Sequence, residues 1–182
     1  MWDEDVRLTD INHPLNLLDF KPTLGYIPLN AKLLDVGCGR GTYLLFLKKH
    51  RPDIITEGVD RTIEYVELCR AYGLNVKLGD AENLDYKDKT FDVVTSFHVL
   101  EHLKDDRNAL DKLLKIAKIR VILILPKTIV SLNQLASIER YHYIPYYTPL
   151  TLTRLLKGFK FKIEQHYAPS GIYESWLVIL DA

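Results

Sequence analysis

The sequence has little cysteine and no excess of either charge. Its only two cysteines, Cys38 and Cys69, cannot build a disulfide framework, and they do not stand at the short spacing of a zinc or redox motif. Lys plus Arg and Asp plus Glu both number 24, so the formal net charge is zero, which argues against a strongly basic nucleic-acid binder. These absences favour a protein of the reducing cytoplasm.

Long hydrophobic runs are missing as well. The most apolar segment, VILILP at 121–126, is far too short to cross a bilayer. The first ten residues, MWDEDVRLTD, lack the apolar centre of a signal peptide. Hydrophobic residues nevertheless make up 47% of the chain, so disorder is a poor interpretation. We expect a single domain over 1–182, in which 1–30 form an N-terminal arm that could act as a lid and 31–182 form the core.

Strand-like and helix-like patterns alternate along most of the chain. Strands are expected at 32–36, 54–60, 75–80, 91–98, 120–125, 160–168 and 174–180. Helices are expected at 42–50, 61–73, 105–118, 131–140 and 148–159. Such alternation indicates a parallel sheet with right-handed crossovers and helices on both faces. The sequence therefore predicts a doubly wound α/β fold.

In this kind of sheet, ligands bind beyond the carboxyl ends of the strands. The first predicted strand runs into DVGCGRGT, with Asp35 followed by Gly37, Gly39 and Gly41. Glycine tolerates positive φ and lets a ligand lie against the main chain, and the next helix begins with unpaired N–H groups. An ordinary strand-to-helix turn is the alternative. The combination favours a nucleotide-like ligand.

The next three strand ends add polar or aromatic groups. Asp60 could accept hydrogen bonds from ribose hydroxyls or merely cap the following helix. Asp80 could bind an adenine amino group or be a solvated loop acid, and Phe97 could lie against a flat ring beside His98. A nicotinamide loop fits poorly, because its G-x-G-x-x-G/A pattern would place Thr42 at the third glycine position. Four consecutive strand ends therefore suit one adenosine-bearing ligand.

Taken together, LLDVGCGRGTYL, EGVDRT, LGDAENL and FDVVTSFHVLEHL resemble the successive motifs of class I S-adenosylmethionine-dependent methyltransferases. The resemblance is greatest to the small-domain group that includes quinone-biosynthesis enzymes, and it covers roughly 30–182. It implies S-adenosyl-L-methionine as the cofactor. It also implies a mostly parallel, seven-stranded, Rossmann-like sheet in which the last strand is antiparallel.

The resemblance also implies roles for single residues. Gly37 and Gly39 would form the turn under the methionine part of the cofactor, and Asp35 would steady the loop or the amino group. The full set of expected cofactor-binding residues is Asp35, Gly37, Cys38, Gly39, Gly41, Asp60, Arg61, Asp80, Ala81, Glu82, Phe97 and His98.

The segment HVLEH leaves two interpretations open. His98, Glu101 and His102 would share a face if the segment were helical, and this spacing can bind zinc or another divalent metal. Some methyltransferases carry Glu-x-x-Glu-His here, but the first position of this sequence is histidine. We therefore expect no metal and assign Glu101 and His102 to hydrogen bonds that organise the loop.

The expected reaction is methyl transfer to an O, N or C nucleophile of an acceptor, expected to be a small molecule, with protein or RNA as alternatives. If the acceptor must lose a proton, His98 is the first candidate base and His142 the second. His142 lies in YHYIPYY (141–147), which is either a packed surface loop or a wall of the acceptor pocket. The alternative function is a cofactor-binding module that acts as a partner subunit. The oligomeric state is not readable from the sequence.

Overall fold

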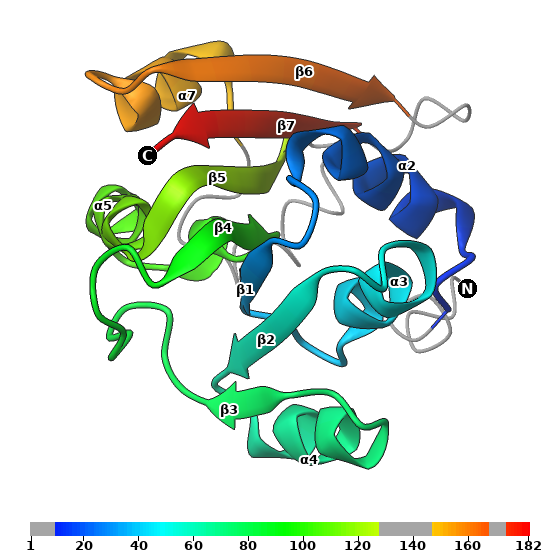
Figure 1. Ribbon diagram of the computed structural model, residues 1–182. Coiled ribbons are helices and arrows are strands. Elements are labelled where there is room, and N and C mark those ends of the chain that lie inside the picture. The colour runs from blue at the N-terminus through cyan, green and yellow to red at the C-terminus, as the bar shows by residue number, and fades with distance from the viewer. Residues whose placement is uncertain (1–9, 128–146, 168–173) are drawn as a thin grey trace.

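The computed structural model describes residues 10–127, 147–167 and 174–182, which contain a sheet flanked by helices (Figure 1). The strands are β1 (Lys32–Val36), β2 (Ile55–Asp60), β3 (Val76–Leu78), β4 (Phe91–Phe97), β5 (Ala117–Pro126), β6 (Phe161–Tyr167) and β7 (Glu174–Asp181). The helices are α2 (Pro14–Thr23), α3 (Thr42–His50), α4 (Ile63–Ala71), α5 (Asp106–Ile116) and α7 (Pro149–Leu156), with short 3-10 helices η1 (Leu24–Tyr26) and η2 (Leu100–His102).

The seven strands form one sheet in the order β3-β2-β1-β4-β5-β7-β6. Strand β1 pairs in parallel with both β2 and β4, whereas β7 pairs antiparallel with β5 and with β6. The predicted doubly wound sheet with an antiparallel last strand is thus confirmed. Because the strand order reverses between β1 and β4, the loops after these two strands leave in opposite directions and open a crevice at the carboxyl edge.

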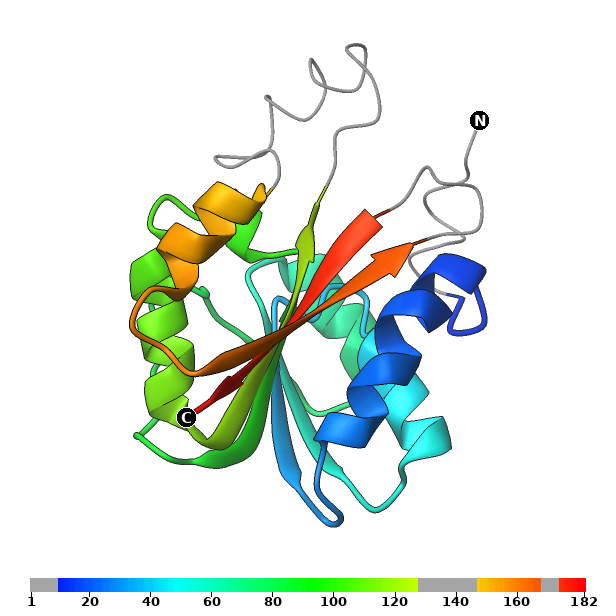
Figure 2. The same ribbon diagram turned by 90° about the horizontal axis from the view of Figure 1, so that it is seen from above.

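Helices cover both faces of the sheet. Figure 2 shows α5 and α7 on one face and α2, α3 and α4 on the other. Neighbouring strand residues pack into opposite layers: Leu33 lies with the side chains of α2 and α3, and Leu34 lies with those of α5 and α7. The central strands are therefore apolar on both faces, which explains why their sequences read as continuous hydrophobic runs.

The N-terminal segment is fixed to the α3 side of the sheet. Helix α2 begins with Pro14, and its Phe20 ring packs 4.9 Å from Tyr43 and 5.4 Å from Phe46, measured between ring centroids. The guanidinium of Arg51 donates hydrogen bonds to the carbonyl oxygens of Leu24, Ile27 and Pro28. Aromatic packing and these hydrogen bonds tie α2 and the segment that follows it to the core.

Several predicted boundaries differ from the structure. The predicted strand 75–80 has only three residues, because β3 is an edge strand that pairs solely with β2 over Val76–Leu78. Helix α5 ends at Ile116 because Ala117 adopts an extended backbone and pairs with Phe91 of β4. The predicted helix 131–140 lies outside the described residues. Within the described ranges, no helix has the length and hydrophobicity needed to span a membrane.

The packing of α2 generates a stability prediction. Phe20 is only 8% exposed, so Phe20→Ala should lower the free energy of unfolding by about 3 kcal/mol, as expected when a buried ring leaves a cavity. Leu29→Ala is the control, because Leu29 is 79% exposed and its truncation should change stability by less than about 0.5 kcal/mol. Urea unfolding measures both, and equal effects would show that α2 does not dock through Phe20.

Candidate functional site

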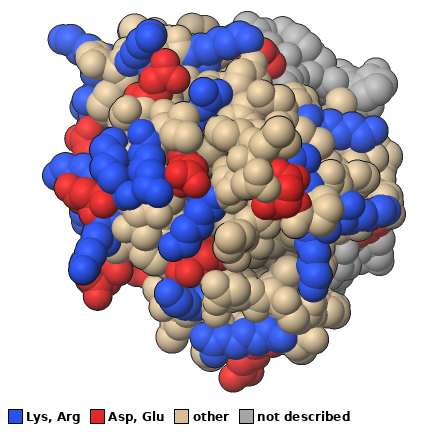
Figure 3. Space-filling model, in the orientation of Figure 1, with Lys and Arg blue, Asp and Glu red and all other residues tan. Residues whose placement is uncertain are grey.

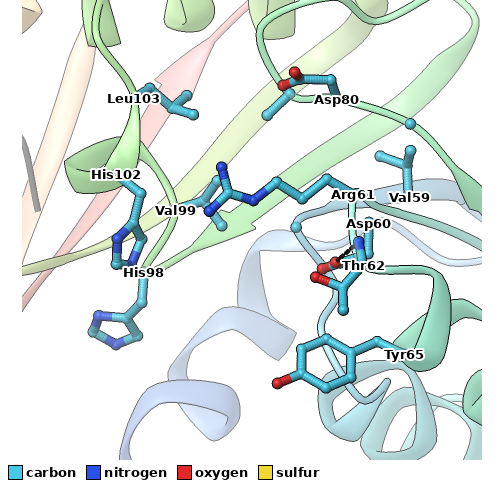
Figure 4. A pocket seen from close by; sticks show the side chains of 13 residues that line it. Val59, Asp60, Arg61, Thr62, Tyr65, Asp80, His98, Val99, His102 and Leu103 are labelled. Carbon is cyan, nitrogen blue, oxygen red and sulfur yellow. Dashed lines mark hydrogen bonds between the residues drawn. The ribbon is translucent and has the colours of Figure 1, made fainter. Parts of the chain in front are cut away.

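A pocket of about 350 Å³ lies at the carboxyl edge of the sheet, beside the point where the strand order reverses (Figure 4). The loops after β1, β2, β3 and β4 all contribute to it. Its lining residues are Gly37, Val59, Asp60, Arg61, Thr62, Tyr65, Gly79, Asp80, Ala81, His98, Val99, His102 and Leu103. The structure thus brings six of the predicted cofactor-binding residues together here: Gly37, Asp60, Arg61, Asp80, Ala81 and His98.

Gly37 allows the first loop to pass close to the fourth strand's end. Its φ is +74°, and a Cβ added there would overlap Val99 Cγ2. The N–H groups of Gly37 and Cys38 both donate to the carbonyl oxygen of Val59, at 2.8 and 3.1 Å, which folds the loop back onto β2. A side chain at this position would push apart two walls of the pocket.

Asp60 links the glycine loop to the start of α4. Its Oδ2 accepts a hydrogen bond from Gly39 N at 2.8 Å, and its Oδ1 accepts one from Thr62 N at 2.9 Å. The alternative role of Asp60 as a helix cap is not observed, because Thr62 is the N-cap of α4 and the helix has no side-chain cap hydrogen bond. A carboxylate has about four acceptor sites, so one bond to each oxygen leaves capacity for two hydroxyl groups.

Asp35, Cys38 and Phe97 do not line the pocket. Asp35 is buried in β1, and its burial raises the pKa of its carboxyl. The hydrogen bond from Thr95 Oγ1 lowers this pKa and the charge of Asp60 raises it, so that the pKa is about 7. Cys38 packs into a small apolar cluster, and Phe97 lies 4.6 Å from Tyr43 between ring centroids. Asp35 and Cys38 are buried and Phe97 is half-buried, so these three residues pack in the interior of the fold.

Four further predicted residues, Gly39, Gly41, Glu82 and His142, also lie outside the lining set or outside the described residues. Gly41 precedes α3 with φ +78°, and a Cβ there would lie 2.8 Å from Cys69 Sγ, so close packing explains this glycine. Glu82 is partly exposed, and its Oε1 accepts a hydrogen bond from Lys104 N at 3.2 Å. His142, the second candidate base, lies outside the described residues.

His98 stands between two buried carboxylates. Its Nε2 is 3.3 Å from Asp19 Oδ2, and its Nδ1 is 3.6 Å from Glu101 Oε1. Burial lowers the pKa of the ring, but the hydrogen-bonding and charge interactions with Asp19 and Glu101 outweigh it and raise the pKa to about 9. At neutral pH the ring is therefore a cation, held by the two acids.

Sequence reasoning missed Asp19. It lies 79 positions before His98, and no spacing rule connects the two. The available signal was weak: Asp19 is the single charged residue in the mostly apolar segment LNLLDF of α2, and a buried acid needs a partner.

The segment HVLEH does not form the α-helix that the metal interpretation requires. His98 precedes the short 3-10 helix η2, so its ring is not placed by helical i, i+3, i+4 spacing. His102 lines the pocket, whereas Glu101 is 2% exposed and is not among the lining residues. Across the described parts of the chain, no three His, Cys, Asp or Glu side chains come together as metal ligands.

A sheet of this order with a pocket at its switch point defines the Rossmann-like class of nucleotide-binding folds. A family model described as "Methyltransferase domain" matches residues 12–166, so the chain belongs to that family. The predicted identification as a class I methyltransferase is confirmed at the level of family and fold, and S-adenosylmethionine as its cofactor is confirmed with it. The narrower resemblance to quinone-biosynthesis enzymes stays a prediction.

The chain is similar to ajmaline N-methyltransferase of Rauvolfia serpentina, with 37% identity over 94 residues that cover 47% of this chain and 32% of that protein. Among solved structures, a Thermotoga maritima S-adenosylmethionine-dependent methyltransferase, described as a possible histamine N-methyltransferase, has a TM-score of 0.76 at 21% identity, covering 99% of this chain and 94% of that one. The magnesium protoporphyrin IX methyltransferase of Synechocystis with bound S-adenosylhomocysteine has a TM-score of 0.70 at 18% identity, covering 98% and 86%. The chain spans between 19% and 46% of the length of the curated relatives that it matches.

The contact between Gly37 and Val99 generates the second prediction. Gly37→Ala should reduce the free energy of unfolding by about 1–3 kcal/mol more than Gly39→Ala, because only the former adds a clash to an unfavourable φ. Gly39 is a matched control, since its φ is +52° and nothing lies within 4 Å of a Cβ built there. Equal losses in chemical denaturation would show that Val99 does not limit the loop.

Proposed function

We propose that the chain transfers a methyl group from S-adenosylmethionine to a nucleophilic atom of a small-molecule acceptor. The observation that carries the proposal is the meeting of Gly37, Asp60, Asp80 and His98 around one pocket at the switch point of the sheet. The similarity to a protein named as an N-methyltransferase of the small molecule ajmaline supports an acceptor of that size.

The surface charge also favours a small acceptor over RNA. On the face drawn in Figure 3, the Lys and Arg side chains of the described residues are interspersed with Asp and Glu. A backbone-binding surface for nucleic acid needs a stripe of positive charge, because each phosphate must be neutralised. The charge on this face is mixed instead, in keeping with the zero net charge of the sequence.

The proposed cofactor residues suit the parts of the ligand. Gly37 presents bare main chain for the methionine part, and the Asp60 carboxylate accepts hydrogen bonds from the ribose hydroxyls. Asp80 and Ala81 follow β3 on the adenine side, and the Arg61 side chain extends across the pocket toward His102 (Figure 4). The buried residues Asp35 and Cys38 support the loop from beneath.

When bound, S-adenosylmethionine supplies a methyl group on a sulfonium, and its transfer to the acceptor breaks the carbon–sulfur bond with the electron pair staying on sulfur. The chain's own contribution is to align the acceptor and to exclude water. For an acceptor that must lose a proton, the neutral His98 imidazole takes that proton at Nδ1, the nitrogen farther from its carboxylate, while Nε2 keeps its proton toward Asp19. Its raised pKa makes the neutral form scarce at pH 7.

Asp60→Ala tests the cofactor site. The substitution removes the hydroxyl acceptor and releases Gly39 N and Thr62 N, so calorimetry should show binding of S-adenosylmethionine weakened by about 100-fold or more. Asp88→Ala is the control, because Asp88 is an exposed turn residue that does not line the pocket. Absence of binding by the unaltered chain would refute the proposed function. Binding without turnover on any acceptor would instead favour the partner-subunit alternative.

The pH dependence tests the role of His98. A base must be neutral to accept a proton, so kcat/KM should rise with pH and level off above an apparent pKa of about 9. A steady-state pH series on an acceptor that does not itself titrate between pH 6 and 10 measures this. A rate that is flat across the range would show that no group with this pKa takes part.

A further inference from the structure

Asp19 is held on two sides by different strands of the sheet. Its Oδ2 lies 3.3 Å from His98 Nε2, beyond the end of β4, and its Oδ1 accepts a hydrogen bond from Ser175 Oγ of β7 at 3.0 Å. Asp19 is 3% exposed and Ser175 is fully buried. A carboxylate fixed from both sides in a buried position has little freedom, so it defines where its partner ring can lie.

The backbone of His98 fixes the other half of the pair. Its φ is +55°, in the left-handed region that is uncommon for residues other than glycine, and its N–H donates to the carbonyl oxygen of Ile124 at 2.9 Å. Such a conformation persists only where the surroundings enforce it, and it is frequent at functional sites. The ring is thereby directed to α2 and to the pocket wall at once.

The other charged groups around the ring do not replace Asp19. Glu101 of η2 lies farther from the ring than Asp19 does, with its Oε1 at 3.6 Å from Nδ1, and its Oε2 has no hydrogen-bond partner among the described residues. His102 of the same 3-10 helix lines the pocket, as do Asp60 and Arg61 after β2 and Tyr65 of α4. Asp19 is the carboxylate that approaches a ring nitrogen most closely among these residues.

We propose that Asp19 is a positioning residue of the methyltransferase site, and that it orients the His98 ring at the pocket wall and so makes helix α2 part of that site. This inference rests on the proposed function for its catalytic meaning, but the pairing itself can be tested without any reaction. The carboxylate fixes which ring nitrogen carries the proton and keeps the ring charged until the pH exceeds its pKa.

The test is a titration of the histidine rings by NMR in the full chain, without cofactor or acceptor. His98→Gln identifies the His98 signal among the six histidines. Asp19→Asn keeps the shape of the side chain and removes its charge, so the His98 pKa should fall by at least about one unit, a tenfold loss of proton affinity. Asp19→Glu restores the charge and should recover at least half of the shift.

Asp92→Asn is the matched control, because the Asp92 carboxylate accepts a hydrogen bond from Lys32 N but lies near the opposite end of β4. It should leave the His98 signal unchanged. In turnover, Asp19→Asn should move the apparent pKa of kcat/KM in the same direction as the ring pKa, whereas a purely structural role would lower the rate at every pH.

The outcomes separate the two proposals. An unchanged His98 pKa in folded Asp19→Asn overturns the positioning role. The proposed function is still supported in that case if calorimetry shows that the unaltered chain binds S-adenosylmethionine. If Asp19→Asn fails to fold, the unaltered chain decides, because a His98 ring with the ordinary pKa of about 6.5 also overturns the pairing. Failure of the unaltered chain to bind the cofactor refutes the proposed function but not the contact.

Discussion

The site depends on the contact between the bare Cα of Gly37 and the side chain of Val99. The loops after β1 and β4 diverge at the switch point, yet here they touch. They can do so because Gly37 has no Cβ, and a Cβ at that position would overlap Val99. The contact sets the distance between two walls of the pocket. It also fixes the residue next to Val99, which is His98, and so the direction from which the ring approaches. The glycine is therefore required by packing between two loops as well as by its φ.

The fold and the outline of the pocket were predictable because both follow from local patterns. Short apolar runs that alternate with amphipathic segments predict parallel strands, and parallel strands end at one edge. Asp60 is the last residue of β2, Asp80 follows the end of β3 by two residues and His98 follows β4 directly, so their sequence positions alone placed them around one pocket. Boundaries were less predictable, since pairing of Ala117 with Phe91 shortened α5 against its helical pattern.

Asp35 and Phe97 show that a position near a strand end is not enough to predict that a residue lines the pocket. Asp35 lies inside β1 and Phe97 is the last residue of β4, and alternate strand residues face the same side of the sheet. Asp35 pairs in register with Thr95, and Phe97 shares the face of Thr95 and Val93, which is the face covered by α2 and α3. Their side chains therefore point to helices and not to the edge. Counting by two from the buried Leu33 would have placed Asp35 on the same face of β1, the face that packs against α2 and α3.

Asp19 could not be found in this way, because its role depends on how α2 docks. Aromatic packing of Phe20 against Tyr43 and Phe46 fixes the helix, and the residue before Phe20 then meets the His98 ring. Burying a lone carboxylate is costly, so the ring cation and Asp19 each lower the cost of burying the other. The expected boundary at residue 30 therefore separates α2 from the core in the sequence, although Asp19 and Phe20 of α2 contact core residues in the structure. A core that began at residue 31 would retain Glu101 and His98 but would lose the carboxylate that lies nearer to the ring.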